Sequence, residues 1–147
     1  MKTFEAQTSR YEARVRESFA RQGLMTTIGA RILNVSPGEV IIELPFHADL
    51  TQQHGYLHAG IVTSIADTAC GYAALSLMPE EADVLSVEYK INLLSPARGE
   101  KFIARASVKR AGRNLTVCEA EVFAANGDEE KLIAAMLATM MTIRERA

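Results

Sequence analysis

The apolar positions of this chain form two long segments that both indicate helices, but helices of different kinds. In residues 3–22, apolar side chains recur at spacings of seven and four between charged ones, which predicts an amphipathic helix on a surface. Residues 59–78 are mainly apolar or small, and Asp67 is the one charged residue among them. A helix with an all-round apolar surface is buried, so this segment predicts the central helix of a core.

Shorter apolar segments, separated by turn-forming residues, indicate strands. Residues 30–35 and 39–44 flank Ser36-Pro37-Gly38, residue types typical of a tight turn, and predict a hairpin. Breaks rich in Gly, Pro and Asn separate three further segments that also predict strands. These are residues 84–93, 102–109 and 115–124.

The last apolar segment, residues 131–143, fits two structures. Its Ala and Met content favours a helix, but it also fits a central strand buried on both faces, and both remain open. The order of elements is typical of an α+β fold in which one sheet wraps one helix. With 147 residues, 48% of them apolar, we expect a single domain over 1–147, with an N-terminal helix region at 1–25.

Charge and cysteine content narrow the classes of function. A formal net charge of −2 gives no broad basic field for nucleic acid. Cys70 and Cys118 are far apart and match neither a disulfide framework nor a zinc motif. The N-terminus lacks the apolar run of a secretory signal, so we expect a cytoplasmic protein that starts at Met1. Asp67 would cost roughly 2.5–3.5 kcal/mol at a bilayer centre, which argues against a membrane span at 59–78.

Two features at the predicted central helix could carry chemistry. Asp67 is the only charged residue between Ala59 and Pro79, and a carboxylate in such a setting can act as a base or nucleophile. Hydrogen bonding to a neighbouring loop explains it equally well. His58 stands where a polar loop becomes helix, so the first backbone N–H groups could receive developing negative charge. An ordinary helix start is the alternative there.

These residues belong to a longer pattern. Residues 52–60 read QQHGYLHAG, and Asp67 follows His58 by nine residues. With SVEY at 86–89, SPARGE at 95–100 and Gly112-Arg113, this resembles the PaaI-like hotdog thioesterases. The resemblance implies a hotdog fold, in which an antiparallel sheet wraps a long central helix. It also implies an acyl-CoA thioesterase that needs no cofactor.

The same resemblance implies a role for each site residue. Gln52 would hold the nucleophilic water or the carboxylate, and Asp67 would be general base or nucleophile. His58 precedes Ala59, whose backbone N–H would polarise the thioester carbonyl, and Ser86 would assist from the following strand. Many members have Gly-Gly after the His and Asn in place of Gln52, and related 4-hydroxybenzoyl-CoA thioesterases use Gln. The acyl group therefore stays open.

Helix geometry bears on assembly. Ala59 and Asp67 are eight residues apart, so on one helix they are separated by about 12 Å along the axis and about 80° around it. One helix therefore cannot present both to one thioester carbon. The resemblance implies two antiparallel helices across a two-fold axis, hence a homodimer as the minimal active unit and a homotetramer overall.

Several residues are candidates for contacts with the substrate or with a metal. Gly60, Arg98, Arg110 and Arg113 are candidates for binding the acyl-CoA, the arginines through its phosphates. Solvated strand ends are the alternative for the arginines. No metal is expected, because the histidines and Asp67 lack ligand spacing.

Two other functions remain possible on the same fold. One is a non-catalytic acyl-CoA sensor, but about 25 residues before the first strand are too few for a helix-turn-helix output domain. The other is a hydratase, which would want a His close to Asp67.

Overall fold

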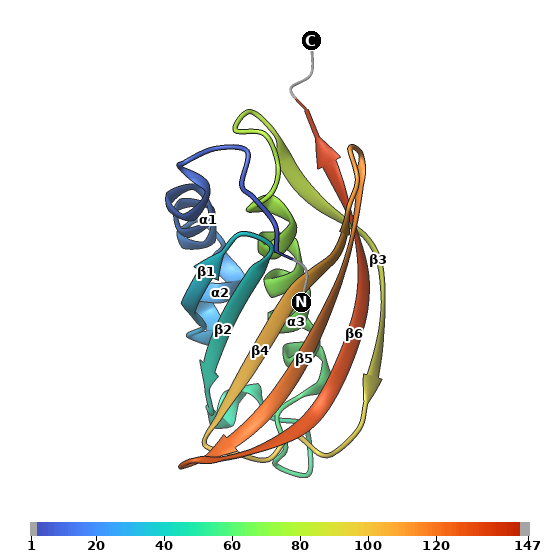
Figure 1. Cartoon of the computed structure of the whole chain (residues 1–147). Helices are drawn as coiled ribbons and strands as arrows, with labels where there is room; N and C mark the ends of the chain where they lie inside the picture. The colour runs from blue at the N-terminus through green and yellow to red at the C-terminus, as the bar shows by residue number, and fades with distance from the viewer. Residues whose placement is uncertain (1–2, 145–147) are drawn as a thin grey trace.

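Six strands form one antiparallel sheet that curls around a single long helix (Figure 1). The computed structural model describes residues 3–144, so the predicted domain limits and the predicted start at Met1 lie outside the described residues. The strand order is β1-β2-β4-β5-β6-β3. The strands are β1 Arg31–Ser36, β2 Glu39–Pro45, β3 Asp83–Leu93, β4 Lys101–Ala111, β5 Leu115–Asn126 and β6 Glu129–Ile143.

The long helix, α3 (Ala59–Leu75), forms the centre of the core. Its Val62, Ile65 and Ala69 are fully or almost fully buried, and they share one core cluster with strand residues such as Phe102 and Met140. Small residues along the helix let the sheet approach closely. The predicted buried helix and the hotdog α+β architecture are therefore confirmed, although α3 ends three residues earlier than expected. No helix within residues 3–144 is long and apolar enough to cross a membrane.

Residues 131–143, for which helix and strand both remained open, lie in strand β6. β6 pairs with β5 on one side and β3 on the other, so both rows of its backbone groups are bonded. Ala134, Ala138 and Met140 alternate toward the core and are fully buried. On the other face Leu137 and Met141 are exposed, so β6 is a central strand buried on one face rather than on both. Pairing along both edges and the burial of this one face outweigh the helix propensity of its alanines and methionines.

The N-terminal prediction was wrong in its extent. Instead of one helix over residues 3–22, the chain forms α1 (Tyr11–Ala20) and α2 (Gly23–Ile28), and residues 3–10 are not helical. The Gln7 side chain donates to the Leu77 carbonyl oxygen at 2.8 Å, which holds this segment across the end of α3. Tertiary contacts therefore override the helical spacing. A short 3₁₀ turn, η1 (Ala48–Leu50), was not predicted either.

Candidate active site

The loop that leads into α3 folds around Gln52. Its backbone N–H donates to the Tyr56 carbonyl oxygen at 2.8 Å, and its side-chain Oε1 accepts from the backbone N–H groups of His54 and Tyr56. Gly55 completes the turn at a φ of 82°, where glycine is unstrained. Because Oε1 accepts from the loop N–H groups, the Gln52 side chain can donate hydrogen bonds to a ligand from its Nε2 group.

His58 is the N-cap of α3. Its Nδ1 accepts a hydrogen bond of 2.8 Å from the backbone N–H of Gly60, which places the proton of the neutral ring on Nε2. A Cβ at position 60 would lie 2.9 Å from that Nδ1, so the cap requires glycine there. The Gly60 N–H, a candidate for substrate binding, is therefore taken up by His58.

The His58 cap does not use the backbone N–H of Ala59. Ile61 and Val62 donate to the His58 carbonyl oxygen at 2.9 and 3.2 Å. Ala59 is the first helical residue, and among residues 3–144 its N–H has no acceptor. An unpaired donor at the positive end of a helix dipole can stabilise an oxyanion.

Asp67 and Ser86 meet in the middle of α3. The Ser86 hydroxyl donates to Asp67 Oδ1 at 2.7 Å, although the two residues are 19 positions apart. Strand β3 brings Ser86 there, just before an irregularity between Ser86 and Glu88 in its pairing with β6. Within residues 3–144, the other carboxylate oxygen, Oδ2, has no hydrogen-bond partner and can receive a water or face a substrate.

Two cavities divide the predicted site residues. The first, about 380 Å³, is lined by Gln52, Ala59 and apolar residues that include Leu57, Val62 and Leu94. The second, about 330 Å³, is lined by Asp67, Ser86 and mainly polar residues. Within a single chain, the Ala59 N–H and the Asp67 carboxylate therefore line different cavities, as their separation along α3 requires.

The three arginines proposed for the phosphates are not brought together. Arg98 lies in the turn before β4 and is exposed, whereas Arg110 lies near the end of that strand and Arg113 in the following hairpin. From Lys101 to Arg110, a strand spans about 30 Å. Their clustering in sequence thus does not predict a common site within one chain.

Cysteine thiols and possible metal ligands are the remaining groups that could carry chemistry. Cys70 and Cys118 are free and buried. Burial raises the pKa of the Cys118 thiol to about 12 and raises that of Cys70 as well, so neither is a ready nucleophile. Within residues 3–144, no group of three or more His, Cys, Asp or Glu is placed to hold a metal ion.

Sequence reasoning missed three polar residues that share the second cavity with Asp67. They are Ser18 from α1, Gln22 from the link between α1 and α2, and Tyr72 from α3. Gly71, an interior helix glycine in the same wall, was the one available signal, because such a glycine destabilises a helix unless space is needed.

Residues 54–131 match the family model of the thioesterase superfamily. The crystal structure of a thioesterase family protein from Silicibacter pomeroyi is similar, with a TM-score of 0.90 and 54% identity over 92% of this chain and 99% of that one. The 1,4-dihydroxy-2-naphthoyl-CoA hydrolase of Listeria monocytogenes is 29% identical over 84% of this chain and 98% of its own length. The E. coli PaaI protein shares the fold, with a TM-score of 0.81 at 21% identity over 91% of this chain and 94% of that one.

Proposed function

The chain belongs to the thioesterase superfamily and has its hotdog fold, and on this premise we propose that it hydrolyses acyl-CoA thioesters in a site shared between two chains. The observation that carries the proposal is the free Ala59 N–H at the start of the same helix that bears Asp67. Hydrolysis of a thioester needs an oxyanion hole that donates hydrogen bonds to the carbonyl oxygen. It also needs a nucleophile that attacks the carbonyl carbon, or a base that activates a water to do so. The name of the Listeria relative supports CoA thioesters as the substrate class.

In the proposed reaction, the Ala59 N–H donates to the thioester carbonyl oxygen and stabilises the negative charge that develops there. Asp67 either removes a proton from a water that attacks the carbonyl carbon or attacks that carbon itself, and the resulting anhydride is then hydrolysed. In both routes the C–S bond breaks and the CoA thiolate leaves and takes up a proton. Ser86 holds one oxygen of Asp67, and the Gln52 Nε2 group orients the water or the carboxylate.

Helix geometry supports a shared site. Ala59 and Asp67 are both on α3, eight residues apart, so about 12 Å and about 80° separate them. An antiparallel partner helix would bring Asp67 of one chain to Ala59 of the other, and two equivalent sites would form in each dimer.

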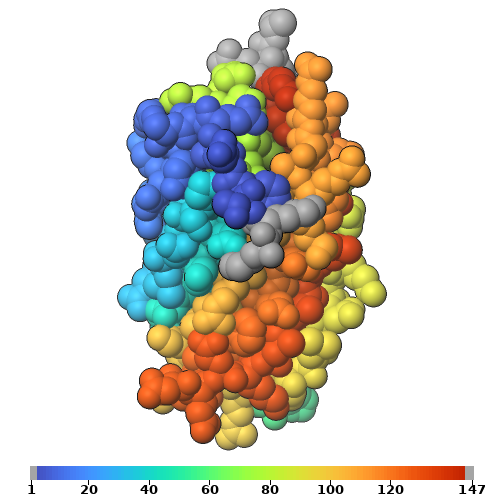
Figure 2. All heavy atoms as spheres, viewed as in Figure 1, coloured from blue at the N-terminus to red at the C-terminus, as the bar shows by residue number. Residues whose placement is uncertain are grey.

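The two edges of the sheet support a partner at β3. The edge strand β1 has six residues and is contacted by α1. The opposite edge strand, β3, has 11 residues and exposes Leu85, Val87, Tyr89 and Leu93. The two edges lie on opposite sides of the molecule, with β1 on the left and β3, in yellow, on the right of Figure 2. The outer backbone groups of such a long apolar edge strand have no partner among residues 3–144 and can pair with a strand of a second chain. We therefore propose a homodimer paired through β3, which assembles further into a tetramer.

Release of free thiol from a panel of acyl-CoAs tests the proposal directly. Purified protein should hydrolyse at least one aromatic or medium-chain acyl-CoA, with the rate proportional to enzyme and lost in the Asp67→Asn variant. If acyl-CoAs bind without thiol release, the chain is instead a sensor on the same fold and the proposal fails.

A further inference from the structure

A third cavity lies at the C-terminal end of α3, away from the groups of the proposed reaction. Its volume is about 310 Å³, and its walls come from the N-terminal segment, the end of α3, the β4–β5 hairpin and the nearby parts of β5 and β6. Within residues 3–144, it shares no lining residue with the cavities that contain Ala59 and Asp67. Ala74 of α3 lines it and follows Asp67 by seven residues, about 10.5 Å along the helix axis. The cavity is therefore separate from the candidate active site.

Two threonines of this cavity occupy core-facing positions without a polar partner. Thr116 on β5 and Thr142 on β6 are 3% and 8% exposed, and the next core-facing residues, Cys118 and Met140, are fully buried. Among the described residues, neither threonine hydroxyl has a hydrogen-bond partner. No sealed side-chain nitrogen or oxygen in this part of the chain lacks one, so both hydroxyls open into the cavity. Valine would serve packing alone at both positions, so the hydroxyls indicate a ligand.

Two arginines give the mouth of the cavity a positive charge. Arg144 donates to Asn114 Oδ1 at 3.1 Å and to the Arg113 carbonyl oxygen at 2.9 Å, which holds it against the β4–β5 hairpin. Its Nε–H and one N–H of each terminal nitrogen remain for a ligand. Among residues 3–144, neither Arg113 nor Arg144 forms an ion pair, and no Asp or Glu lines the cavity. The unbalanced charge favours an anion.

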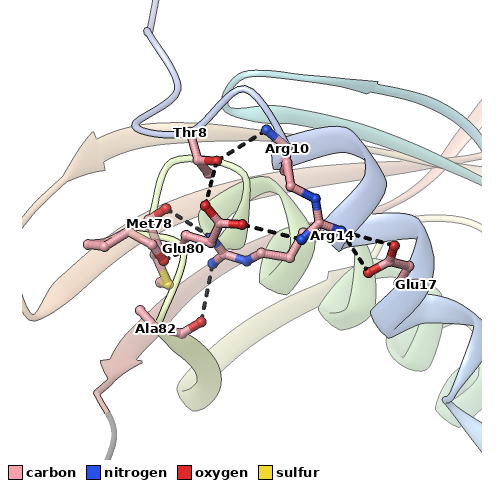
Figure 3. A network of polar contacts seen from close by, with 8 residues as sticks. Thr8, Arg10, Arg14, Glu17, Met78, Glu80 and Ala82 are labelled. Carbon is pink, nitrogen blue, oxygen red and sulfur yellow. Dashed lines mark hydrogen bonds and ion pairs between the residues drawn. The ribbon is translucent and has the colours of Figure 1, made fainter.

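The C-terminal end of a helix repels anions, but the carbonyl groups at this end of α3 already have donors. The Arg14 guanidinium donates to four carbonyl oxygens there at 2.8–3.4 Å (Figure 3). They belong to Leu75, Met78, Pro79 and Ala82. The charge of Arg14 thus offsets the negative end of the helix dipole. Glu80, which follows Pro79, pairs with Arg10 at 3.3 Å and not with the arginines of the cavity (Figure 3).

The wall opposite the threonines is apolar. Leu77 and Met78, which follow α3, are 7% and 3% exposed and line the cavity beside Pro79. Small-molecule sites combine such apolar walls with a few converging polar groups, and the volume is sufficient for a compact ligand. An organic anion can use both the apolar wall and the charged mouth, whereas an inorganic ion uses only the charge.

We infer that this cavity binds a small organic carboxylate, with its carboxylate between the threonine hydroxyls and the arginines and its short apolar body against the end of α3. Thr116 pairs with Met140, so Thr142 is its diagonal neighbour on the same face, about 7–8 Å away. One carboxylate group that accepts from both hydroxyls spans this distance. Arginine matches a carboxylate with paired N–H donors. The site goes beyond the proposed hydrolysis and uses none of its groups.

Isothermal titration calorimetry with butyrate tests the site. The wild type should bind one butyrate per chain, and Thr116→Val and Arg144→Gln should each weaken the affinity about tenfold. Thr116→Ser keeps the hydroxyl and should bind butyrate as the wild type does. Arg21→Gln removes the charge of an exposed arginine outside the cavity and is the matched control, with unchanged affinity expected.

Thermal unfolding separates a ligand-binding role of the hydroxyl from a structural one. Thr116→Val should keep or raise the melting temperature without ligand, because the hydroxyl has no protein partner and valine favours strands. A lower melting temperature would show that the hydroxyl stabilises the fold and would overturn its role in binding. The inference also fails if butyrate does not bind, if Thr116→Val and Arg144→Gln leave the affinity unchanged, or if inorganic phosphate binds more tightly than butyrate.

The phosphates of coenzyme A are another source of an anion, so CoA is titrated beside butyrate. Its affinity should be the same in the wild type and in Thr116→Val, because the cavity is separate from the candidate active site. A CoA affinity that falls in Thr116→Val would make the cavity part of the substrate site and overturn the inference. Failure of every acyl-CoA to release thiol would refute the proposed function alone, since butyrate binding does not depend on hydrolysis.

Discussion

The start of α3 and its middle serve the same proposed reaction, but the chain builds them differently. The start depends on contacts within residues 52–60, where the Gln52 loop and the His58 cap leave one N–H unpaired. The middle depends on contacts over long sequence separations, because Asp67 is held by Ser86 of β3 and faces Ser18 of α1 across a cavity.

The acid end therefore depends more on distant parts of the chain than the donor end does. The donor at the start is a backbone group, so its chemistry survives many side-chain changes and responds mainly to geometry. The acid end depends on side chains and on an edge strand that is exposed along most of its length. Side-chain substitutions at the acid end should therefore change the reacting group directly. Those at the donor end should act by moving the loop that positions the Ala59 N–H.

The largest effect is expected for Asp67→Asn, which keeps the shape but removes the base or nucleophile. We expect kcat to fall on the order of 10²–10⁴-fold, with little change in melting temperature. Thiol release and thermal unfolding monitored by circular dichroism measure both. Turnover within about tenfold of the wild type, or ~1.4 kcal/mol, would exclude Asp67 from either role.

Gln52→Ala should have the next largest effect, a fall in kcat on the order of 10–10³-fold, because a misplaced water still reaches the carbonyl. Gln52→Glu separates two roles, since it retains an oxygen for the loop N–H groups and lacks the Nε2 donor. We expect it to be impaired like the Ala variant. Activity near that of the wild type in Gln52→Glu would mean that the residue only shapes the loop.

Ser86→Ala should lower kcat about tenfold, as expected for one hydrogen bond to a charged group. Ser86 acts through Asp67, so Ser86→Thr, which restores a hydroxyl, should recover most of the loss. The comparison of the two variants by steady-state kinetics is the measurement. Equal losses in both would show that the shape of the side chain at this position, rather than the hydroxyl, explains the effect.

The smallest effect is expected for metal removal. Incubation with a chelator, or addition of divalent cations, should leave the rate of thiol release unchanged, because the proposed site uses a backbone donor and a carboxylate. Activity that is lost with a chelator and restored by one specific metal would contradict this mechanism.

The sequence predicts the donor end better than the acid end. The loop, the cap and the start of α3 are encoded by neighbouring residues, and α3 begins at the predicted Ala59. The family resemblance implies only that Ser86 assists from the following strand, and the structure adds that its hydroxyl donates to Asp67. The contacts of Ser18 and Gln22 with the Tyr72 hydroxyl could not be predicted, because they need α1 to pack over α3.

Long-range packing also explains the other differences. β6 is a strand because two neighbouring strands pair with it, although its composition favours a helix. Residues 3–10 are not helical, because the Gln7 side chain donates to the Leu77 carbonyl oxygen just after the end of α3. Arg98 and Arg110 are close in sequence, but Arg98 precedes β4 and Arg110 lies near its far end, so most of the length of that strand separates them.

The most direct test of the shared site mixes two inactive variants. Ala59→Pro removes the N–H donor at the first helical position, where proline is tolerated, and the His58 backbone is already extended with a ψ of 136°. Asp67→Asn removes the acid. Unfolding and refolding the two together in equal amounts makes about half of the dimers mixed, and each mixed dimer has one intact site. Recovery of roughly a quarter of wild-type activity is the predicted result. No recovery, with mixed dimers verified by mass spectrometry, would place both residues in the site of one chain and contradict the account.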